Sequence, residues 1–141
     1  MIAYFDTSAL VKLVLDEGGS QDSLALWNQA SSVVTSQLAY PEARAALRAA
    51  VSSGRLSGIK QRGAIDELDE LWAQLLPTDV DEELAASAGK LADRHGLRGA
   101  DAIHLGTAIV AAGDDFVVVT WDRKLGESAL AEGLPVALYP D

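Results

Sequence analysis

The chain has 141 residues, the usual size of one domain, and we expect a single domain over residues 1–141. It has no cysteine, which excludes a disulfide framework, a thiolate zinc site and a cysteine nucleophile. The net charge of -10 argues against broad electrostatic attraction to nucleic acid, although eight of the 21 acidic residues lie in one segment, 66–83, that has no Lys or Arg.

The first half of the chain predicts two strands and three helices. Thr7 or Ser8 is expected to cap the helix that follows the first apolar run. Ser36 is expected to cap a later helix that has Pro41 in its first turn, where a missing N–H costs little. The expected elements are strands over 1–6 and 33–35, a helix that carries Leu10 to Leu15, a helix over 24–30 and a helix from Ser36 to Gly54.

The second half continues the alternation of helices and strands. Pro77 is expected to close a long amphipathic helix before a short extended piece. The expected elements are helices over 59–75, 81–95, 100–112 and 123–131, an extended piece over 78–80, and strands over 116–120 and 136–138. This alternation predicts an α/β fold with a largely parallel sheet covered on both faces. In such a sheet, the binding site lies at the carboxyl ends of the strands.

Four acidic residues lie near the junctions where that site is expected. Asp6 ends the first strand, and Asp122 follows the strand FVVVT after one intervening residue. Glu42 lies in the first turn of its helix, and Asp101 opens another helix after a glycine. Each acid alone can be explained as a helix cap or as a partner of the helix dipole. Taken together, the four positions are better explained as one cluster.

A cluster of carboxylates without cysteine is typical of a site for a hard cation. Mg²⁺ or Mn²⁺ suits oxygen ligands better than Zn²⁺ does. A metal-bound water can attack phosphorus while the cation neutralises charge that develops on the phosphate oxygens. Hydrolysis of a phosphodiester is therefore the leading hypothesis for the chemistry of Asp6, Glu42, Asp101 and Asp122.

Five further residues are candidates for supporting roles, and four of them also have a simpler structural explanation. His104 shares a helix face with Asp101, but a packed histidine has the same spacing. Thr120 is placed to orient Asp122, or is an ordinary strand residue. Arg44 and Arg48 are candidates to meet RNA phosphates or a partner's acidic groups, or are solvated arginines of a helix face. Trp121 is a candidate to stack on a base of the substrate.

Four motifs, in this order and spacing, resemble the PIN-domain nucleases, and specifically the VapC-type toxins of bacterial toxin–antitoxin pairs. They are FDTSAL, YPEARAAL, RGADAIHLGTA and VVVTWDRKL, and the similarity extends over essentially the whole chain. The resemblance implies a three-layer α/β/α fold with a parallel sheet of about five strands. It also implies Mg²⁺- or Mn²⁺-dependent endoribonuclease activity, a homodimer, and inhibition by a small cognate antitoxin.

The same resemblance assigns roles to residues of this sequence. It implies that Asp6, Glu42, Asp101 and Asp122 are catalytic, and that Asp6, Asp101 and Asp122 bind the metal. Thr120 matches the hydroxyl residue that often accompanies the last acid. The RNA target is left open, because RNA recognition relies on loops and local shape.

Other classes of protein fit the sequence less well. Phosphatases that form a phosphoaspartate need a second Asp two positions after the first, where this chain has Ser8. A phosphate-accepting receiver domain needs a lysine after a late strand, and Lys124 lies too far past Thr120. The non-enzymatic alternative is a catalytically silent PIN module that acts as a binding partner in a regulatory complex. The presence of all four acids argues against that alternative.

The sequence also suggests where the protein acts. No apolar stretch reaches the roughly 20 residues that a membrane span requires, and no basic segment precedes the first strand. We therefore expect an unprocessed cytoplasmic protein that does not enter a membrane.

Overall fold

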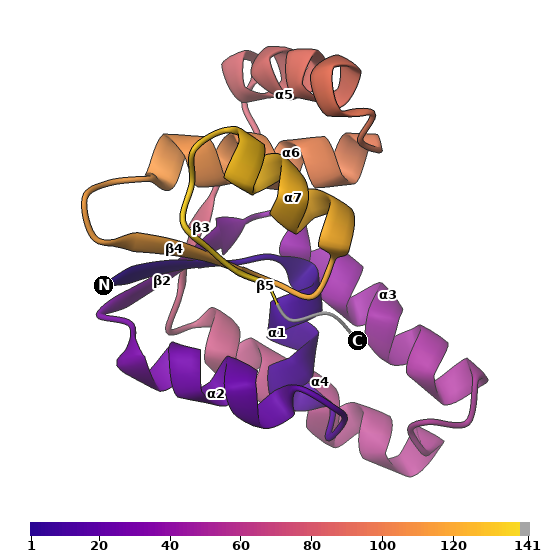
Figure 1. The fold of residues 1–141 in the computed structure, drawn as a ribbon. Coiled ribbons are helices and arrows are strands. Elements are labelled where there is room, and N and C mark those ends of the chain that lie inside the picture. Colours follow the sequence, from indigo (N-terminus) through magenta and orange to yellow (C-terminus); the bar gives the residue numbers. More distant parts are fainter. Residues whose placement is uncertain (139–141) are drawn as a thin grey trace.

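The computed structural model describes residues 1–138, which form a five-stranded sheet between two layers of helices (Figure 1). All neighbouring strands are parallel, in the order β3-β2-β1-β4-β5. The three-layer α/β/α architecture with five strands is confirmed. The strands are β1 (Ile2–Phe5), β2 (Ser32–Ser36), β3 (Leu76–Thr78), β4 (Phe116–Thr120) and β5 (Val136–Leu138).

Helices cover both faces of this sheet. In Figure 1, α5, α6 and α7 lie on one side, α1, α2 and α4 lie on the other, and α3 packs against α1 and α4. No helix within residues 1–138 is long and apolar enough to cross a membrane. The helices are α1 (Thr7–Val14), α2 (Ser20–Gln29), α3 (Ala39–Ser52), α4 (Gly58–Trp72), α5 (Glu82–His95), α6 (Gly99–Ala111) and α7 (Arg123–Ala131).

Strand β1 divides the core into two parts, because successive side chains of a strand point to opposite faces of the sheet. Tyr4 faces α5 and α6, where it packs in one cluster with Leu91 and Leu105. Phe5 faces the opposite layer, where it packs in one cluster with Leu10. The side chains of all five residues are fully or almost fully buried. The alternation is therefore what sends the Tyr4 side chain toward α6.

The strand order places the predicted site at the centre of one sheet edge. β1 and β4 are neighbours, with Phe5 opposite Val119, although a long stretch of chain separates them. Chain connections leave β1 toward β2 on one side and β4 toward β5 on the other, so the strand order changes direction between them. This is the position at which open parallel sheets bind ligands. Asp6 and Asp122 follow these two strands.

Two of the expected helix starts were wrong. Asp6, not Thr7 or Ser8, is the N-cap of α1, because its side chain accepts a hydrogen bond from the Ala9 N–H at 3.0 Å. The Ser36 hydroxyl accepts from the Leu38 N–H at 3.1 Å, but α3 begins only at Ala39. In both places, a hydroxyl group that is able to cap the helix makes a different hydrogen bond instead.

Two other boundaries differ from the expectation. α2 begins at Ser20 rather than at residue 24, because Gly19 adopts the left-handed conformation, with φ of 93°, directly before it. Pro77 lies inside β3 instead of before an extended piece over 78–80. β3 is an edge strand that pairs only with β2. The missing N–H of Pro77 therefore breaks no hydrogen bonds to a strand on the other side of β3.

Candidate active site

Asp6 is the buried centre of the site. Its side chain is held by three donors: Oδ1 accepts from the Ser8 hydroxyl at 2.6 Å and from the Ala9 N–H at 3.0 Å, and Oδ2 accepts from the Thr120 hydroxyl at 2.5 Å. Asp6 is only 3% exposed. Burial raises the pKa of Asp6, while the nearby His104 and these hydrogen bonds act in the opposite direction. The carboxylate is thus fixed in one orientation.

Two hydroxyl groups join the ends of β1 and β4 around Asp6. The Ser8 hydroxyl donates to Asp6 and accepts from the Trp121 N–H at 2.9 Å. The Thr120 hydroxyl donates to Asp6 and accepts from the Asp122 N–H at 2.9 Å. Each hydroxyl has one proton to donate and two lone pairs to accept, so each can make both of these bonds at once. Thr120 therefore orients both acids, which is more than an ordinary strand residue does.

Asp122 and Asp101 lie within each other's electrostatic field. Asp122 is the N-cap of α7 and accepts from the Leu125 N–H at 3.0 Å, so the capping role foreseen for it is present as well. Asp101 lies in the first turn of α6, and its side chain is 24% exposed. Burial and the negative charge of Asp122 raise the pKa of Asp101, against the nearby guanidinium of Arg98. The pair is electrostatically strained and suited to a cation.

Glu42 completes the acidic cluster from α3. Its Oε1 accepts from the Thr7 hydroxyl at 2.6 Å and from His104 Nε2 at 2.7 Å. Partial burial opposes ionisation of Glu42, but these two donors outweigh it and lower the pKa of Glu42. Its negative charge also raises the pKa of Asp101. All four predicted acids thus belong to one interacting group.

His104 is a packed residue that also touches the acidic cluster. It is 2% exposed, its Nε2 meets Glu42, and its Nδ1 lies 2.8 Å from the Tyr4 hydroxyl. Tyr4, Thr7 and Ser8 were not among the residues predicted to belong to this site. Only the register of β1 and the start of α1 bring these three hydroxyl groups to the acids.

The three residues predicted to contact substrate or partner lie in different surroundings. Arg44 donates to the Tyr40 hydroxyl at 2.9 Å, and its guanidinium lies 5.7 Å from the Tyr40 ring. Arg48 is exposed on α3. Trp121 is 8% exposed and packs in the core, with Lys12 on its ring. This burial leaves little of the ring surface for a base to stack on, and it disfavours the expected substrate contact.

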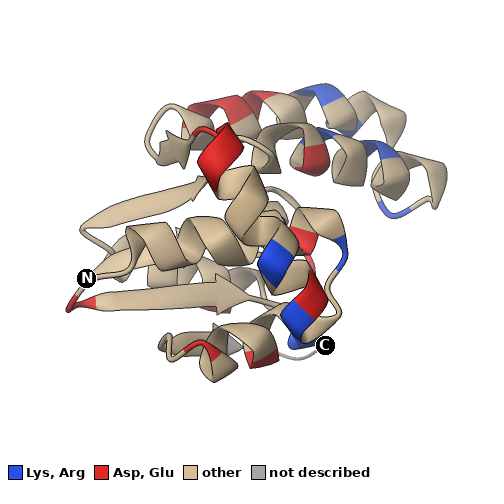
Figure 2. Ribbon diagram, turned by 90° about the horizontal axis from the view of Figure 1, so that it is seen from above, with Lys and Arg blue, Asp and Glu red and all other residues tan. Residues whose placement is uncertain are grey.

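Charges of both signs meet at the end of the sheet toward which the strands point (Figure 2). Arg98 Nε lies 3.7 Å from Asp101, and the Arg98 side chain is 90% exposed. Lys124 reaches the same loop, because its Nζ would lie 3.7 Å from a Cβ placed on Gly96. The acidic cluster is therefore bordered by basic groups in a protein that is acidic as a whole.

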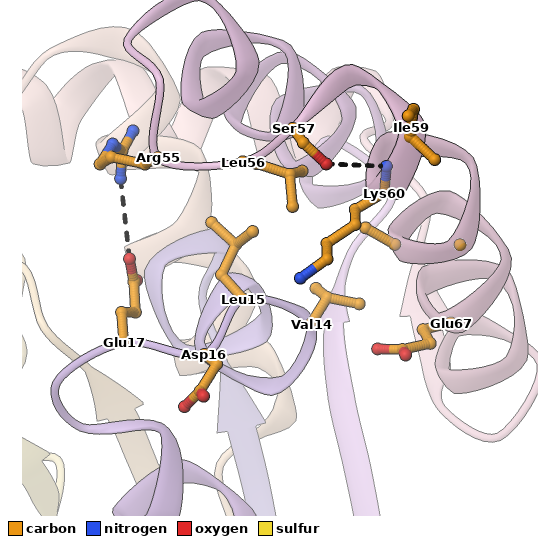
Figure 3. Close-up of a pocket in the computed structure, with 12 residues that line it drawn as sticks. Val14, Leu15, Asp16, Glu17, Arg55, Leu56, Ser57, Ile59, Lys60 and Glu67 are labelled. Atoms are coloured by element: carbon orange, nitrogen blue, oxygen red, sulfur yellow. Dashed lines mark hydrogen bonds and ion pairs between the residues drawn. The ribbon is translucent and has the colours of Figure 1, made fainter.

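A groove of about 760 Å³ lies elsewhere, between the end of α1 and the connection from α3 to α4 (Figure 3). Val14, Leu15 and Leu56 form its apolar floor, and an ion pair of 3.6 Å joins Glu17 to Arg55 at one end. None of the four acids lines this groove. The chemistry expected from the acids thus belongs to the sheet edge and not to this cavity.

The donor set suits a hard cation, although protein atoms alone do not enclose one. Within residues 1–138, no three Asp, Glu or His side chains are arranged so that they could hold a metal ion by themselves. Mg²⁺ does not require such a cage, because it keeps several waters and binds one or two carboxylates together with phosphate oxygens. The strained pair Asp101 and Asp122 is of this kind. The residues therefore fit a magnesium or manganese ion.

The comparisons with known proteins agree with this geometry. A family model for the PIN domain matches residues 3–129. Ribonuclease VapC45 from Mycobacterium tuberculosis (strain CDC 1551 / Oshkosh) and Ribonuclease VapC49 from strain ATCC 25618 / H37Rv of the same species are each 41% identical to the chain over 136 residues. The matches cover 96% of this chain and 94% of each relative. The chain belongs to the VapC-type PIN-domain family.

Solved structures show the same PIN fold at much lower identity. A toxin–antitoxin complex from Klebsiella pneumoniae contains a chain that superimposes with a TM-score of 0.69 at 18% identity, covering 99% of both chains. The family resemblance noted in the sequence motifs is confirmed, and so is the fold that it implied.

Proposed function

We propose that this PIN-domain protein is a metal-dependent endoribonuclease toxin that a cognate antitoxin neutralises. The observation that carries the proposal is the convergence of Asp6, Glu42, Asp101 and Asp122 at the carboxyl ends of β1 and β4. The 41% identity to two proteins named ribonuclease VapC supports RNA as the substrate. The fold neighbour from a toxin–antitoxin complex supports an antitoxin as the partner.

We propose that Asp101 and Asp122 bind Mg²⁺, or Mn²⁺ as a substitute, with waters and phosphate oxygens as its other ligands, and that Asp6 supports the same ion as the third predicted ligand. When bound, the ion would polarise a phosphodiester and lower the pKa of a coordinated water. Asp101 and Asp122 offer the more exposed carboxylates. Asp6 Oδ1 accepts two hydrogen bonds and Oδ2 accepts one, so Oδ2 retains a lone pair for a cation.

The remaining groups of the site act by holding charge and position. Ser8 and Thr120 keep Asp6 in one orientation, and Thr120 also fixes the backbone that carries Asp122. Glu42 has Oε1 tied to Thr7 and His104, while Oε2 makes no hydrogen bond within residues 1–138. We propose that Oε2 accepts a hydrogen bond from the attacking water and thereby orients it.

The basic border of the cluster supplies contacts for the RNA backbone. Arg98 and Lys124 come from the loop before α6 and from the first turn of α7, on either side of Asp101 and Asp122. Phosphate contacts of this kind position a nucleic acid without reading its sequence. Basic groups beside the acidic cluster would allow a chain with a net charge of -10 to bind RNA there.

The proposal also includes the assembly and the place of action. An antitoxin is expected to cover the acidic cluster, and two copies of the chain are expected to form a homodimer in the cytoplasm. Light scattering of the purified toxin measures whether it is a homodimer, and inhibition of RNA cleavage by added antitoxin measures whether the site is covered.

The decisive experiment is cleavage of total cellular RNA by antitoxin-free protein in Mg²⁺ or Mn²⁺, with EDTA as the metal-free condition. Asp101→Asn is expected to lower cleavage by about 100- to 1000-fold. Asp115→Asn is the matched control, because Asp115 lies before β4 at the opposite sheet edge and pairs with the N-terminal amine. Discrete cuts with 5′-phosphate and 3′-hydroxyl ends are expected. Fragments that end in a 2′,3′-cyclic phosphate would contradict the metal-activated water.

A folded, antitoxin-free protein that cuts no RNA would instead favour the catalytically silent binding module. In that case, the acidic cluster would serve only to bind a partner, and Asp101→Asn would weaken partner binding without any change in RNA.

A further inference from the structure

A continuous chain of hydrogen bonds runs from the core of the protein to the acidic cluster. It begins at the Tyr4 hydroxyl, passes through both ring nitrogens of His104 and ends on Oε1 of Glu42. The two contacts are 2.8 Å and 2.7 Å long. The rings of Tyr4 and His104 meet edge to face, with centroids 6.0 Å apart. This chain of hydrogen bonds connects three separate elements, β1, α6 and α3.

The two ends of this chain determine which ring nitrogen carries the proton. An ionised carboxylate only accepts hydrogen bonds, so Nε2 of His104 must donate to Glu42. In the neutral imidazole, Nδ1 is then the acceptor, and the Tyr4 hydroxyl must donate to it. Burial raises the pKa of Tyr4 well above its ordinary value, so the phenol keeps the proton that it donates.

Two threonine hydroxyl groups also surround the Tyr4 hydroxyl. Thr35 donates its own proton to the Phe5 carbonyl at 2.7 Å, and Thr107 donates to the Ile103 carbonyl at 2.7 Å. Both threonine hydroxyls also interact with the Tyr4 phenol. Tyr4, Thr35 and Thr107 are fully buried, so water does not compete for these groups. With Nε2 donating to Glu42, Nδ1 of this buried ring needs a donor, and the Tyr4 hydroxyl is in place to be that donor.

Glu42 depends on this arrangement because its own helix does not fix it. It is anchored through one oxygen only, by Thr7 and His104, and its side chain is 31% exposed. If Nε2 lost its proton to Nδ1, two acceptors would face each other at 2.7 Å and Glu42 would be pushed away from His104. The position of Glu42 in the acidic cluster is thus set by Tyr4, at the other end of this chain of hydrogen bonds.

We propose that Tyr4 is a positioning residue for the nuclease reaction, which acts through the tautomer of His104 to hold Glu42 in place. This inference rests on the proposed function, because it assigns Tyr4 a role in that reaction. Tyr4 does not touch substrate or metal. Its contribution is to make the Nε2–H form of His104 the only one that satisfies both neighbours.

The first test compares kcat and KM of variants in the RNA-cleavage assay, well below the unfolding temperature. Tyr4→Phe removes one oxygen and is expected to lower kcat by about 10-fold with KM unchanged, the lower end of the range for losing an outer partner of an active-site group. Tyr40→Phe is the matched control, because its hydroxyl bonds Asp69 and Arg44 on the surface. It is expected to leave kcat unchanged.

Two substitutions of His104 separate its two contacts. His104→Gln keeps a donor near the position of Nε2 and is expected to retain most of the activity. His104→Asn keeps a polar group only near the position of Nδ1 and is expected to lower kcat by about 100-fold. If both variants lost activity equally, His104 would matter for packing alone and the proposal would be overturned.

The second test needs neither RNA nor metal. Proton–nitrogen correlation NMR of isotope-labelled protein reports which ring nitrogen is protonated, and the sequence has only two histidines, His95 and His104. We expect His104 to be in the Nε2–H form in the parent protein, and to gain Nδ1–H form in Tyr4→Phe, with His95 unchanged. An Nδ1–H form in the parent protein, or no change in Tyr4→Phe, would overturn the proposal.

The two tests also separate this inference from the proposed function. A parent protein that shows the expected tautomer but never cuts RNA would contradict the nuclease and, with it, the positioning role. A parent protein that cuts RNA, with kcat unaffected by Tyr4→Phe, would contradict only the inference.

Discussion

The Thr120 hydroxyl donates to Oδ2 of Asp6 at 2.5 Å, although the two residues are 114 positions apart. The oxygen of that Thr120 hydroxyl also accepts from the Asp122 N–H at 2.9 Å. One hydroxyl group therefore holds two of the four acids in register across neighbouring strands. Both Thr120 and Asp6 are buried, so no water replaces this contact when it is lost.

Thr120→Val keeps the shape of the side chain and removes the hydroxyl group. It leaves an oxygen of the buried Asp6 without its donor, which is expected to lower the free energy of unfolding by about 1–3 kcal/mol. RNA cleavage should fall at the same time, because both acids lose their orientation. Urea unfolding and the cleavage assay measure the two effects. Thr120→Ser retains the hydroxyl, and equal behaviour of the Val and Ser variants would contradict the assigned role.

Asp101→Asn is expected to uncouple activity from stability. The pKa of Asp101 is raised in the folded protein, so the ionised carboxylate opposes folding at neutral pH. Without metal, the variant should be more stable than the parent by up to about 1 kcal/mol, the scale for two partly exposed charges.

The stability gain of Asp101→Asn should shrink as the pH falls through the raised pKa, where the parent carboxyl becomes neutral too. Thermal unfolding in EDTA at several pH values measures it. RNA cleavage should meanwhile fall by about 100- to 1000-fold, the range for removing one electrostatic group from an active site. A variant that is inactive and also less stable would indicate a structural role for Asp101.

Gly19→Ala tests whether the close packing of Gly19 against Trp121, beside the site, stabilises the fold. Gly19 has φ of 93°, and an added Cβ would lie 2.6 Å from Nε1 of Trp121, the residue next to Asp122. The strained backbone and the overlap are expected to cost about 1–3 kcal/mol of unfolding free energy. Gly18→Ala is the matched control, because a Cβ on Gly18 meets no atom within 4 Å. Chemical denaturation that gives equal values for the two variants would contradict this explanation.

Glu132 gives the protein a stabilising contact that is lost in acid. It accepts from Arg94 at 2.8 Å and from His95 Nε2 at 2.7 Å, and the hydrogen bonds from these two residues lower the pKa of Glu132. A carboxyl with a lowered pKa stabilises the fold above its ordinary pKa of 4.5, and this contribution disappears as the pH falls through the folded-state pKa.

Glu132→Gln should therefore be less stable than the parent by about 0.5–1 kcal/mol at pH 6, with a smaller difference below the lowered pKa. Thermal unfolding over this pH range measures the difference. Glu127→Gln, an exposed position on the same helix, should change stability little at either pH. A difference between Glu132→Gln and the parent that grows in acid would have the wrong sign for this contact.

Much of the fold follows from local sequence patterns. The strand over 116–120, the helix over 123–131 and the strand over 136–138 have the bounds that were expected, because apolar runs and capping residues mark both ends of each element. The four acids were found because parallel strands place their carboxyl ends at one edge. Helix starts were less predictable where several residues able to cap stand together, as in the segment 6–8.

The hydroxyl groups of the site could not be predicted in the same way. Tyr4 reads as an apolar member of a buried strand, and only the packing of α6 on the sheet brings His104 to it. Trp121 stands beside Asp122 in the sequence, yet neighbouring residues leave a strand in different directions, and its ring lies in the core. Long-range packing, which no local pattern encodes, decides these placements.

The strand order determines at what stage of translation the active site can be complete. β1 leaves the ribosome first, but its partner β4 and the acid that follows it come almost last. During translation, at about 5–20 residues per second, the growing chain lacks Asp101 and Asp122 for most of its synthesis, and Asp122 is the last of the four acids to be added. With the role proposed for Asp122, a nascent chain has no complete active site, and a co-translated antitoxin has that interval in which to fold.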